Sequence, residues 1–514
     1  MRTKNSFLNF LANTGSTVIS MVLSFICRTV FIATLGKAYL GVNGLFSNIL
    51  TVLSLAELGI GAAMIYHMYD PVAREDIVQV RQLLNLYRRL YTAVALVIAV
   101  AGLSLTPFLS YLIKDAGKTS LSMEYLTWVY LLYLFNTVSS YFFCYKRSIT
   151  DAHQKGYINV CIGSALQIAQ FLVQIVVLLV TRNFIAYLLL QIASNVLNNV
   201  ITAWMADRLY PYLKEDRKSL PSKSTRHHIY KHMGAMFLHK LGDVVVNNTD
   251  NVIMSAFAGL DSVGIYSNYL LIETSINTAL NGVFGAFTAS IGNLGATENK
   301  EDVFRVYRVI NFLGFVLYGY CTIAFLVMYN PFIEVWAGKD FLFPMSIVLI
   351  MEMNFYVRGM RKATLTFRDA LGLYWYDRYK PIFEVIINLV TSLYLVMKIG
   401  VAGIFLGTLI SNLTTCFWVE PLVTYRHGFG RSVGHYFRTY AVYTLTTVVV
   451  GGFTYWLCSH FTMGGIAEIA CKIVVCTVVY NGIVALLYCR TMEFQELWKQ
   501  TMRMLKRGRA DLAE

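Results

Sequence analysis

Charged side chains are scarce in this chain: Asp, Glu, Lys and Arg together make up 14% of its 514 residues. None of its nine cysteines forms a CxxC pair, so neither a zinc site nor a disulfide framework is indicated. Walker A, HExxH, GxSxG and Rossmann patterns are also absent from the sequence. These absences exclude the usual nucleotide-driven and hydrolytic machineries. Polar intervals long enough for a soluble domain are lacking as well.

Apolar residues dominate instead. The chain is 56% hydrophobic with a mean hydropathy of +0.54, which is typical of a polytopic membrane protein. The first apolar run is too long for a signal-peptide core, so we expect it to be retained as a membrane helix. We predict about fourteen transmembrane helices, at residues 9–35, 42–68, 90–113, 125–145, 158–181, 184–206, 233–258, 263–290, 309–330, 345–366, 381–398, 402–425, 439–458 and 467–488.

The net charge of +14 follows the predicted topology. Of the 43 Lys and Arg residues, 33 fall in the segments that share a side with the amino terminus and 6 in the opposite loops, when residues at a span end are counted with the adjoining segment. By the positive-inside rule this split places both termini in the cytoplasm. The positive charge therefore reports topology and contact with anionic lipid rather than a nucleic-acid partner.

Short motifs recur in the same order along the two halves of the chain, at offsets of 217 to 226 residues. The pairs are Gly36-x4-Gly41 with Gly259-x4-Gly264, Glu75-Asp76 with Glu301-Asp302, Asp151-Ala152 with Asp369-Ala370, and Ser194-Asn195 with Ser411-Asn412. Each copy holds six predicted helices. Because six is even, the copies share one orientation and are related by an axis along the membrane normal, a pattern typical of transporters.

The predicted fold is therefore an all-α integral membrane protein with two six-helix lobes and a C-terminal helix pair. The predicted domains are residues 1–206 (N-lobe, helices one to six), 207–232 (basic cytoplasmic linker), 233–425 (C-lobe, helices seven to twelve), and 426–514 (helices thirteen and fourteen with a basic cytoplasmic tail).

The first two predicted helices each carry a polar stripe that includes a charge, Arg28 on one and Glu57 on the other. A charge at bilayer depth costs roughly 2.5–3.5 kcal/mol on insertion scales, so it faces a cavity or a partner. Arginine suits a pyrophosphate because its guanidinium offers paired donors and stays charged. We therefore expect both residues at a substrate site. The alternative is that Arg28 pairs with Glu57 and only holds the lobe together.

The second half is richer in polar residues at helical spacing. We assign substrate contacts to four of them: Lys240, Arg358, Asn277 and Asn281. Oxygen-rich positions can bind Na⁺ or a proton, and the candidates for a coupling ion are Asp243, Asp250, Glu384, Asn388, Thr408 and Ser411. The alternative to both assignments is that these Ser, Thr and Asn stripes only form contacts between packed membrane helices. No other cofactor, no metal and no catalytic residue is expected.

The stretch from Arg28 to Gly61 reads RTVF-x3-LG-x2-YLGVNGLF-x-N-x-L-x2-LSLAELGIG. It resembles the Wzx-type bacterial polysaccharide flippases, a branch of the superfamily that also holds the lipid II flippase and the multidrug and toxin extruders. The resemblance implies a multi-pass protein of the cytoplasmic (inner) membrane that moves a polyprenyl (undecaprenyl)-pyrophosphate-linked oligosaccharide outward by alternating access. It also implies contact with membrane lipids and other polysaccharide assembly proteins, and a cation site on helices seven, eleven and twelve.

Two other functions are compatible with parts of this pattern. A cation-coupled multidrug exporter shares the architecture but favours an acidic, aromatic pocket. A membrane glycosyltransferase or polymerase usually presents catalytic acids on a large outer loop, and the outer loops here are short. Without a nucleotide site, transport depends on an ion gradient, the membrane potential or downstream consumption of the product. The potential favours outward movement of an anion by about 2.3 kcal/mol per charge per 100 mV.

Overall fold

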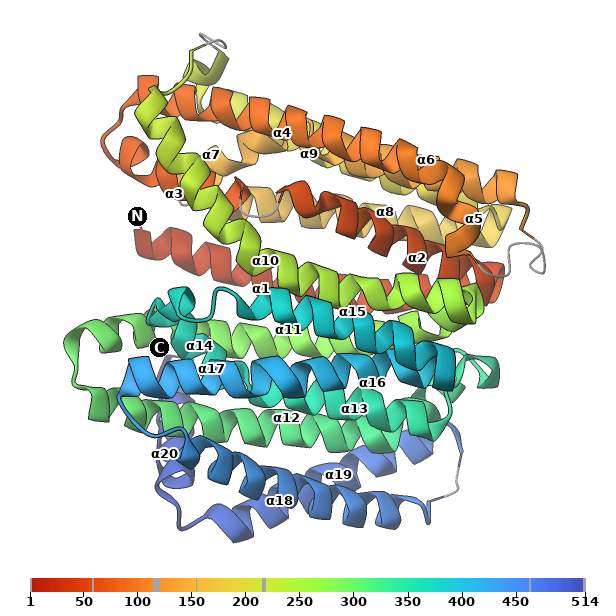
Figure 1. Ribbon diagram of the computed structural model, residues 1–514, viewed down its shortest axis with the longest axis vertical. Coiled ribbons are helices and arrows are strands. Elements are labelled where there is room, and N and C mark those ends of the chain that lie inside the picture. Colours follow the sequence, from red (N-terminus) through yellow and green to blue (C-terminus); the bar gives the residue numbers. More distant parts are fainter. Residues whose placement is uncertain are drawn as a thin grey trace. The chain divides into compact units, whose positions relative to one another are not determined.

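The computed structural model describes residues 2–57, 60–113, 121–153, 155–214, 219–461 and 464–511, and these are almost entirely helical (Figure 1). The first helices are α1 (Arg2–Leu35), α2 (Lys37–Leu53), α3 (Ile60–Ala73), α4 (Ile77–Leu105), α5 (Leu109–Leu112), α6 (Met123–Ser140), α7 (Arg147–Ala152), α8 (Gly156–Thr181), α9 (Phe184–Leu209) and α10 (Lys223–Ala258). They are followed by α11 (Leu260–Thr297), α12 (Lys300–Trp336), α13 (Met345–Met360), α14 (Lys362–Ala370), α15 (Lys380–Ile399), α16 (Val401–Ser411), α17 (Phe417–Val423), α18 (Gly434–Cys458), α19 (Gly465–Tyr488) and α20 (Met492–Asp511).

All fourteen predicted segments fall on helices or on runs of consecutive helices, which confirms the all-α membrane fold. Within the described ranges, eight segments are long and apolar enough to cross a membrane. They are Ile77–Leu112, Gly156–Thr181, Phe184–Leu209, Lys300–Trp336, Lys380–Ile399, Val401–Phe429, Gly434–Cys458 and Gly465–Tyr488. Ile19–Leu35 is a shorter apolar helix within the described ranges, and the count of fourteen stays a prediction.

Two predicted helices are broken where polar groups enter them. The segment 42–68 leaves α-helical geometry after Leu53, where the Ser54 hydroxyl donates to the carbonyl of Leu50 at 2.7 Å. Such back-bonding bends helices. The segment 345–366 is divided at Arg361, which lies between α13 and α14 and whose guanidinium binds a buried carboxylate. Sequence periodicity does not report either break, because both depend on side-chain hydrogen bonds.

The chain forms two compact units, Met1–Ser267 and Asn268–Glu514. The first unit includes α10, which packs against α2 and α3. The boundary therefore lies within α11, beyond the basic segment 207–232. The proposed division into repeated lobes rests on the sequence motifs and stays a prediction.

A reciprocal contact joins the first motif of the repeat to its copy, within the first unit. Gly41 lies against the backbone of Leu260, and Gly264 lies against the backbone of Lys37. The sequence repeat aligns Gly41 with Gly264 and Lys37 with Leu260. The contact of Gly41 with Leu260 and that of Gly264 with Lys37 are therefore the same contact with the roles of the two copies exchanged. Lys37 and Asp261 form an ion pair at 3.3 Å beside this contact. Reciprocity of this kind is what a two-fold relation between copies produces.

The third motif of the repeat also occupies matching places in the two halves. Asp151 and Asp369 are the penultimate residues of the short helices α7 and α14. Asn159 donates to the Asp151 carboxylate at 3.0 Å, and Arg368 binds both Asp369 and Asp377. Burial raises the pKa of Asp151, against the lowering effects of the Asn159 hydrogen bond and the charge of Arg147.

A buried ionic network ties four elements of the second unit together. The Arg361 guanidinium donates twice to the Glu420 carboxylate, both at 2.8 Å, and once to the Asn412 side chain at 2.6 Å. Lys380 adds a bond to Glu420 at 2.5 Å. The Glu420 side chain is 0% exposed, so its charge depends wholly on these partners.

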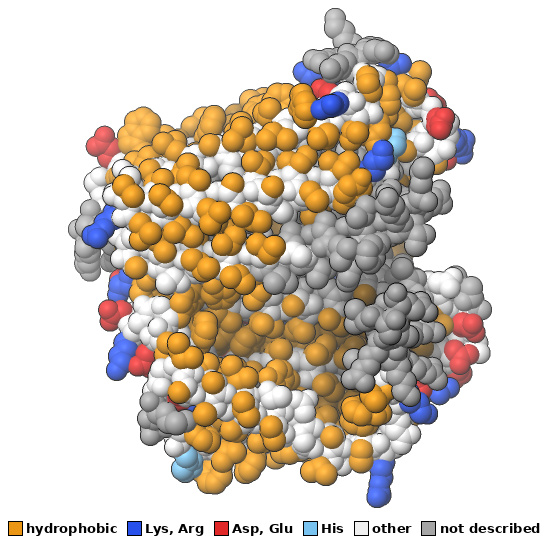
Figure 2. Space-filling model, turned by 180° about the vertical axis from the view of Figure 1, so that it is seen from behind, with side chains coloured by type: hydrophobic (Ala, Val, Ile, Leu, Met, Phe, Trp, Pro, Cys, Tyr) orange, Lys and Arg blue, Asp and Glu red, His pale blue; other side chains and the backbone are white. Residues whose placement is uncertain are grey.

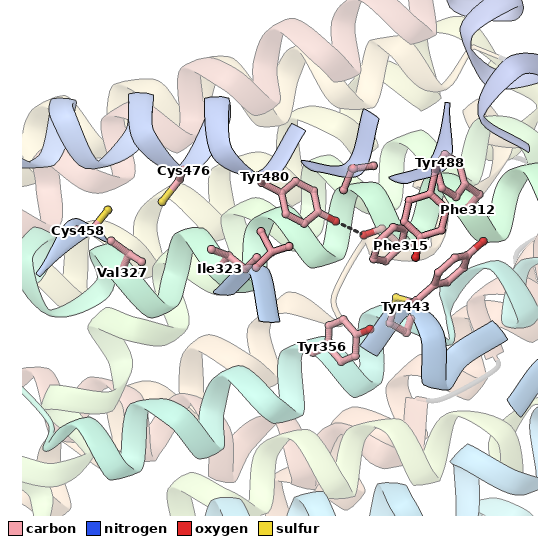
Figure 3. Packing of buried hydrophobic residues seen from close by; sticks show 13 residues of the cluster. Phe312, Phe315, Ile323, Val327, Tyr356, Tyr443, Cys458, Cys476, Tyr480 and Tyr488 are labelled. Carbon is pink, nitrogen blue, oxygen red and sulfur yellow. Dashed lines mark hydrogen bonds between the residues drawn. The ribbon is translucent and has the colours of Figure 1, made fainter. Parts of the chain in front are cut away.

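Helices α18 and α19 attach to α12 through an aromatic cluster (Figure 3). Phe315 stacks on Tyr443 of α18 with ring centroids 4.3 Å apart. The Tyr480 hydroxyl of α19 donates to the Phe315 carbonyl at 2.9 Å, the bond drawn in Figure 3. The C-terminal pair is thus an integral part of the second unit. On the face seen in Figure 2, apolar side chains cover the sides of the helices and charged ones gather at their ends.

We expect Gly41→Ala and Gly264→Ala to destabilise the protein alike, because each new methyl group would overlap a backbone carbonyl that cannot move aside. Overpacking of this kind costs about 1–3 kcal/mol. Thermal unfolding in detergent measures the effect. Gly282→Ala in α11 is the matched control, since its methyl group would meet no atom within 4 Å. A midpoint for Gly41→Ala equal to that of the control would show that the contact tolerates a side chain.

Glu420→Gln should lower the thermal midpoint strongly, because it leaves Arg361 and Lys380 buried with no anion between them. Breaking a buried ion pair costs about 3–5 kcal/mol. Glu334→Gln is the control, since Glu334 pairs at 3.5 Å with Lys339, whose side chain is 83% exposed, and such a pair contributes about 0–1 kcal/mol. Equal midpoints for the two variants would rule out a stabilising role for the network.

Candidate functional site

Arg28 lies on α1, half-buried among polar groups of the first unit. Its guanidinium reaches the carbonyl of Ser267 at 3.5 Å, a long contact. The phenols of Tyr133 and Tyr187 lie close enough to interact with its charge, and the Tyr133 hydroxyl donates to the Asn43 side chain. The cation is therefore surrounded by neutral polar groups, an environment that suits an anionic ligand.

Glu57 is not the partner of Arg28. Its carboxylate accepts a hydrogen bond from the Tyr91 hydroxyl at 2.8 Å, and no ion pair joins it to Arg28, although both residues are described. Tyr91 in turn accepts from Tyr87 at 3.0 Å. The alternative that this pair merely holds the lobe together therefore finds no support. The assignment of both residues to a substrate site stays a prediction.

Three of the candidate residues, Lys240, Asp243 and Asp250, lie on α10. The side chains of Lys240 and Asp243 lie outside the described residues. Asp250 is 5% exposed and belongs to the first unit. Near it, the Ser255 hydroxyl donates to the carbonyl of Leu112 at 2.7 Å, which fixes this end of α10 against α5.

The remaining substrate candidates lie in the second unit. Arg358 on α13 is half-buried, and its positive charge acts on the carboxylate of Glu273 on α11. Asn277 follows Glu273 by one turn and is half-buried, whereas Asn281, one turn further on, is exposed. The structure therefore brings Arg358 close to the polar face of α11, as the helical spacing of that face suggests.

The candidate coupling-ion residues of α15 and α16 face one another. The Asn388 amide donates to the Thr408 hydroxyl at 2.9 Å, and the Ser411 hydroxyl donates to the backbone carbonyl of Glu384 at 2.7 Å. These bonds are contacts between packed helices. One acceptor is left over: the Asn388 side-chain oxygen is buried and has no hydrogen-bond partner in the described chain.

Two cavities are lined by residues outside the predicted sites. One, of about 470 Å³, lies in the first unit between α6, α8 and α9. Of the described residues that line it, seven are Asn or Gln and one, Arg147, is charged. The other, of about 450 Å³, lies in the second unit and is mainly apolar and aromatic. Its wall contains Glu352, whose two carboxyl oxygens are buried without a hydrogen-bond partner among the described residues.

The sequence held a signal for one of these groups but not for the others. Asn159, Gln167 and Gln170 follow helical spacing in an otherwise apolar segment, so the amide stripe was visible. Glu352 stands alone among apolar residues, and the partners of Glu420 come from distant parts of the chain. The spacing of residues along the sequence predicts neither the surroundings of Glu352 nor those of Glu420.

Known proteins share this sequence pattern and this architecture. The profile of a family described as polysaccharide biosynthesis protein matches residues 6–288. A search of curated proteins found no match. Among solved structures, the inward closed form of the lipid II flippase MurJ has a TM-score of 0.63 at 13% identity, over 94% of this chain and 99% of that one.

Two other similar structures are multidrug transporters. An inward-facing MATE family transporter of the MOP superfamily has a TM-score of 0.63 at 15% identity, over 79% of this chain and 94% of that one. A mutant of the Vibrio cholerae MATE transporter VcmN has a TM-score of 0.53 at 13% identity, over 84% and 99%. These structures establish the fold, and the family profile covers more than half of the chain. The chain therefore belongs to the polysaccharide biosynthesis protein family and has the fold of the MOP-superfamily membrane transporters.

Proposed function

We propose that the protein is a flippase. It moves an oligosaccharide linked to polyprenyl (undecaprenyl) pyrophosphate from the cytoplasmic to the outer leaflet of the bacterial inner membrane, for cell-surface polysaccharide biosynthesis. It acts by alternating access and catalyses no chemical step, and both termini lie in the cytoplasm. The match of residues 6–288 to the polysaccharide biosynthesis family carries this proposal. Membrane lipids and other polysaccharide assembly proteins are its expected partners.

Arg28 supplies the cation for the pyrophosphate in this proposal. Within the described chain its contact is one long bond to a backbone carbonyl, so its donors are available to a ligand. The neutral phenols around it do not cancel its charge at neutral pH. Outward movement of the anion is favoured by the membrane potential, so the protein has to lower the barrier and select the substrate.

Coupling to Na⁺ or a proton is part of the same proposal. Asn388 and Thr408 offer side-chain oxygens at one point between α15 and α16, and one of these oxygens has an open acceptor position in the described chain. Hard cations such as Na⁺ favour oxygen ligands. Asp243, Asp250, Glu384 and Ser411 are the other candidates that the sequence offers.

A cation-coupled multidrug exporter is the second candidate. The apolar cavity of the second unit favours it, because Glu352 lies there beside Tyr356, Phe417 and Tyr440. An acid among aromatic rings is the kind of pocket that holds an organic cation. The family match gives the flippase the stronger support.

Removing the protein from its host should make the lipid-linked oligosaccharide accumulate in the cytoplasmic leaflet. An external glycosidase applied to spheroplasts would then release less glycan than from cells that contain the protein, while the total pool would rise. Normal exposure of the glycan together with new sensitivity to cationic drugs would replace the flippase with the exporter.

Arg28→Ala should reduce glycan exposure by about ten- to a hundredfold, since hydrogen bonds to charged groups contribute about 1.5–3 kcal/mol each. Arg28→Lys should retain part of the activity, because it keeps the charge but loses the paired donors. The amount of protein in the membrane and its thermal midpoint should match the wild type in both variants. Wild-type exposure in Arg28→Ala would remove this residue from the site.

A further inference from the structure

The amide-lined cavity of the first unit is made by two facing helices. On α8, Asn159, Gly163 and Gln167 follow one another at intervals of four residues, so they share a face. On α9, Gln191, Ser194 and Asn198 likewise share a face. All six residues line the cavity. Both helices are among those apolar enough to cross a membrane, so this concentration of polar groups is a costly feature.

Part of this polarity is satisfied within the protein. Asn195 donates to the Asn136 side chain at 3.0 Å, and Ser20 of α1 donates to Gln167 at 3.1 Å. Other atoms are not satisfied: the side-chain oxygens of Asn159 and Asn198 are buried and have no hydrogen-bond partner in the part of the chain that the structure describes. The wall of the cavity therefore holds more hydrogen-bonding groups than the described contacts between its helices use.

The chemistry of the wall limits what that ligand can be. Each amide offers two donors and an acceptor, which matches hydroxyl groups that both donate and accept. Among the described lining residues there is no carboxylate and no aromatic ring for an organic cation, and Arg147, an exposed residue, supplies the one positive charge. The volume of about 470 Å³ is within the usual range of about 300–1,000 Å³ for small-ligand sites.

Helix register and hydrogen bonds connect the wall of this cavity to the surroundings of Arg28. Tyr187, whose phenol interacts with the Arg28 charge, lies one turn before Gln191 on α9. Its carbonyl accepts a hydrogen bond from Gln174, on the same face of α8 as the cavity amides, at 3.1 Å. The hydrogen bond of Ser20 to Gln167 joins the Arg28 face of α1 to the same wall. A ligand with an anionic end at Arg28 could therefore extend its neutral, hydroxyl-rich part along this cavity.

We propose that the cavity between α6, α8 and α9 is the sugar subsite of the protein, where Gln167, Gln191 and Asn198 bind the hydroxyl groups of the lipid-linked oligosaccharide. The assignment rests on the proposed flippase function and adds to it the part of the chain that binds the glycan. Arg28 selects the pyrophosphate common to all such lipids, and the amides of α8 and α9 select the sugars.

The test compares two lipids in proteoliposomes that contain the full-length protein: polyprenyl pyrophosphate carrying the complete oligosaccharide, and the same lipid carrying a single sugar. The readout is the initial rate at which each becomes accessible to a glycosidase on the far side. The double variant Gln191→Leu/Asn198→Leu should slow the complete oligosaccharide about tenfold or more, since each lost hydrogen bond is worth about 1 kcal/mol. The single-sugar lipid should move at close to the wild-type rate.

A second variant tests the space rather than the hydrogen bonds. Gly163→Leu keeps every amide but fills the cavity, because a Cβ at this position would lie 3.7 Å from the Asn198 oxygen, an ordinary contact. It should show the same selective loss. The matched control is Asn199→Leu: Asn199 adjoins Asn198 but donates to the carbonyl of Ser140 at 2.9 Å and is not part of the cavity wall. This control should keep the wild-type ratio of the two rates.

Three outcomes would overturn the subsite. If both lipids slow equally in the cavity variants, the amides are structural or act on the pyrophosphate. If neither lipid slows, the sugars bind elsewhere. If the wild-type protein moves neither lipid, the flippase function itself fails, and the subsite fails with it.

Discussion

Hydrocarbon supplies no hydrogen bonds, so every polar atom within the membrane needs a partner in the protein or access to a water-filled space. In the second unit Arg361, Lys380 and Glu420 satisfy this requirement by binding one another at short distances. In the first unit the amides of α8 and α9 satisfy it only partly, and a cavity lies where the partners are missing. The same requirement is therefore met by a fully paired ionic network in one unit and accompanies a polar cavity in the other.

This contrast separates charged residues that stabilise from those available to bind. Arg361 has a bidentate carboxylate partner and an amide, so its charge is fully used. Arg28 has a single long contact to a backbone carbonyl and neutral phenols around it. Both arginines fall within segments that the sequence predicts as membrane helices, so they look alike in the sequence. Their partners distinguish a structural cation from one that can meet an anion.

The sequence predicted well the features that depend on local periodicity. Helix positions followed from apolar runs. It failed where a partner comes from a distant segment: Glu57 binds Tyr91, one of 34 tyrosines, and no spacing rule selects that ring. The breaks at Ser54 and Arg361 were missed for a different reason: side-chain hydrogen bonds rather than apolar periodicity set them.

The reciprocal glycine contact has a consequence for the origin of the chain. Gly41 meets the Leu260 backbone and Gly264 meets that of Lys37, so the two copies of this motif contact each other through equivalent residues. A self-complementary contact needs only one ancestral motif, because two molecules that each carry it can make both halves of the contact. A duplicated motif therefore inherits the contact, and each copy can change elsewhere without losing it.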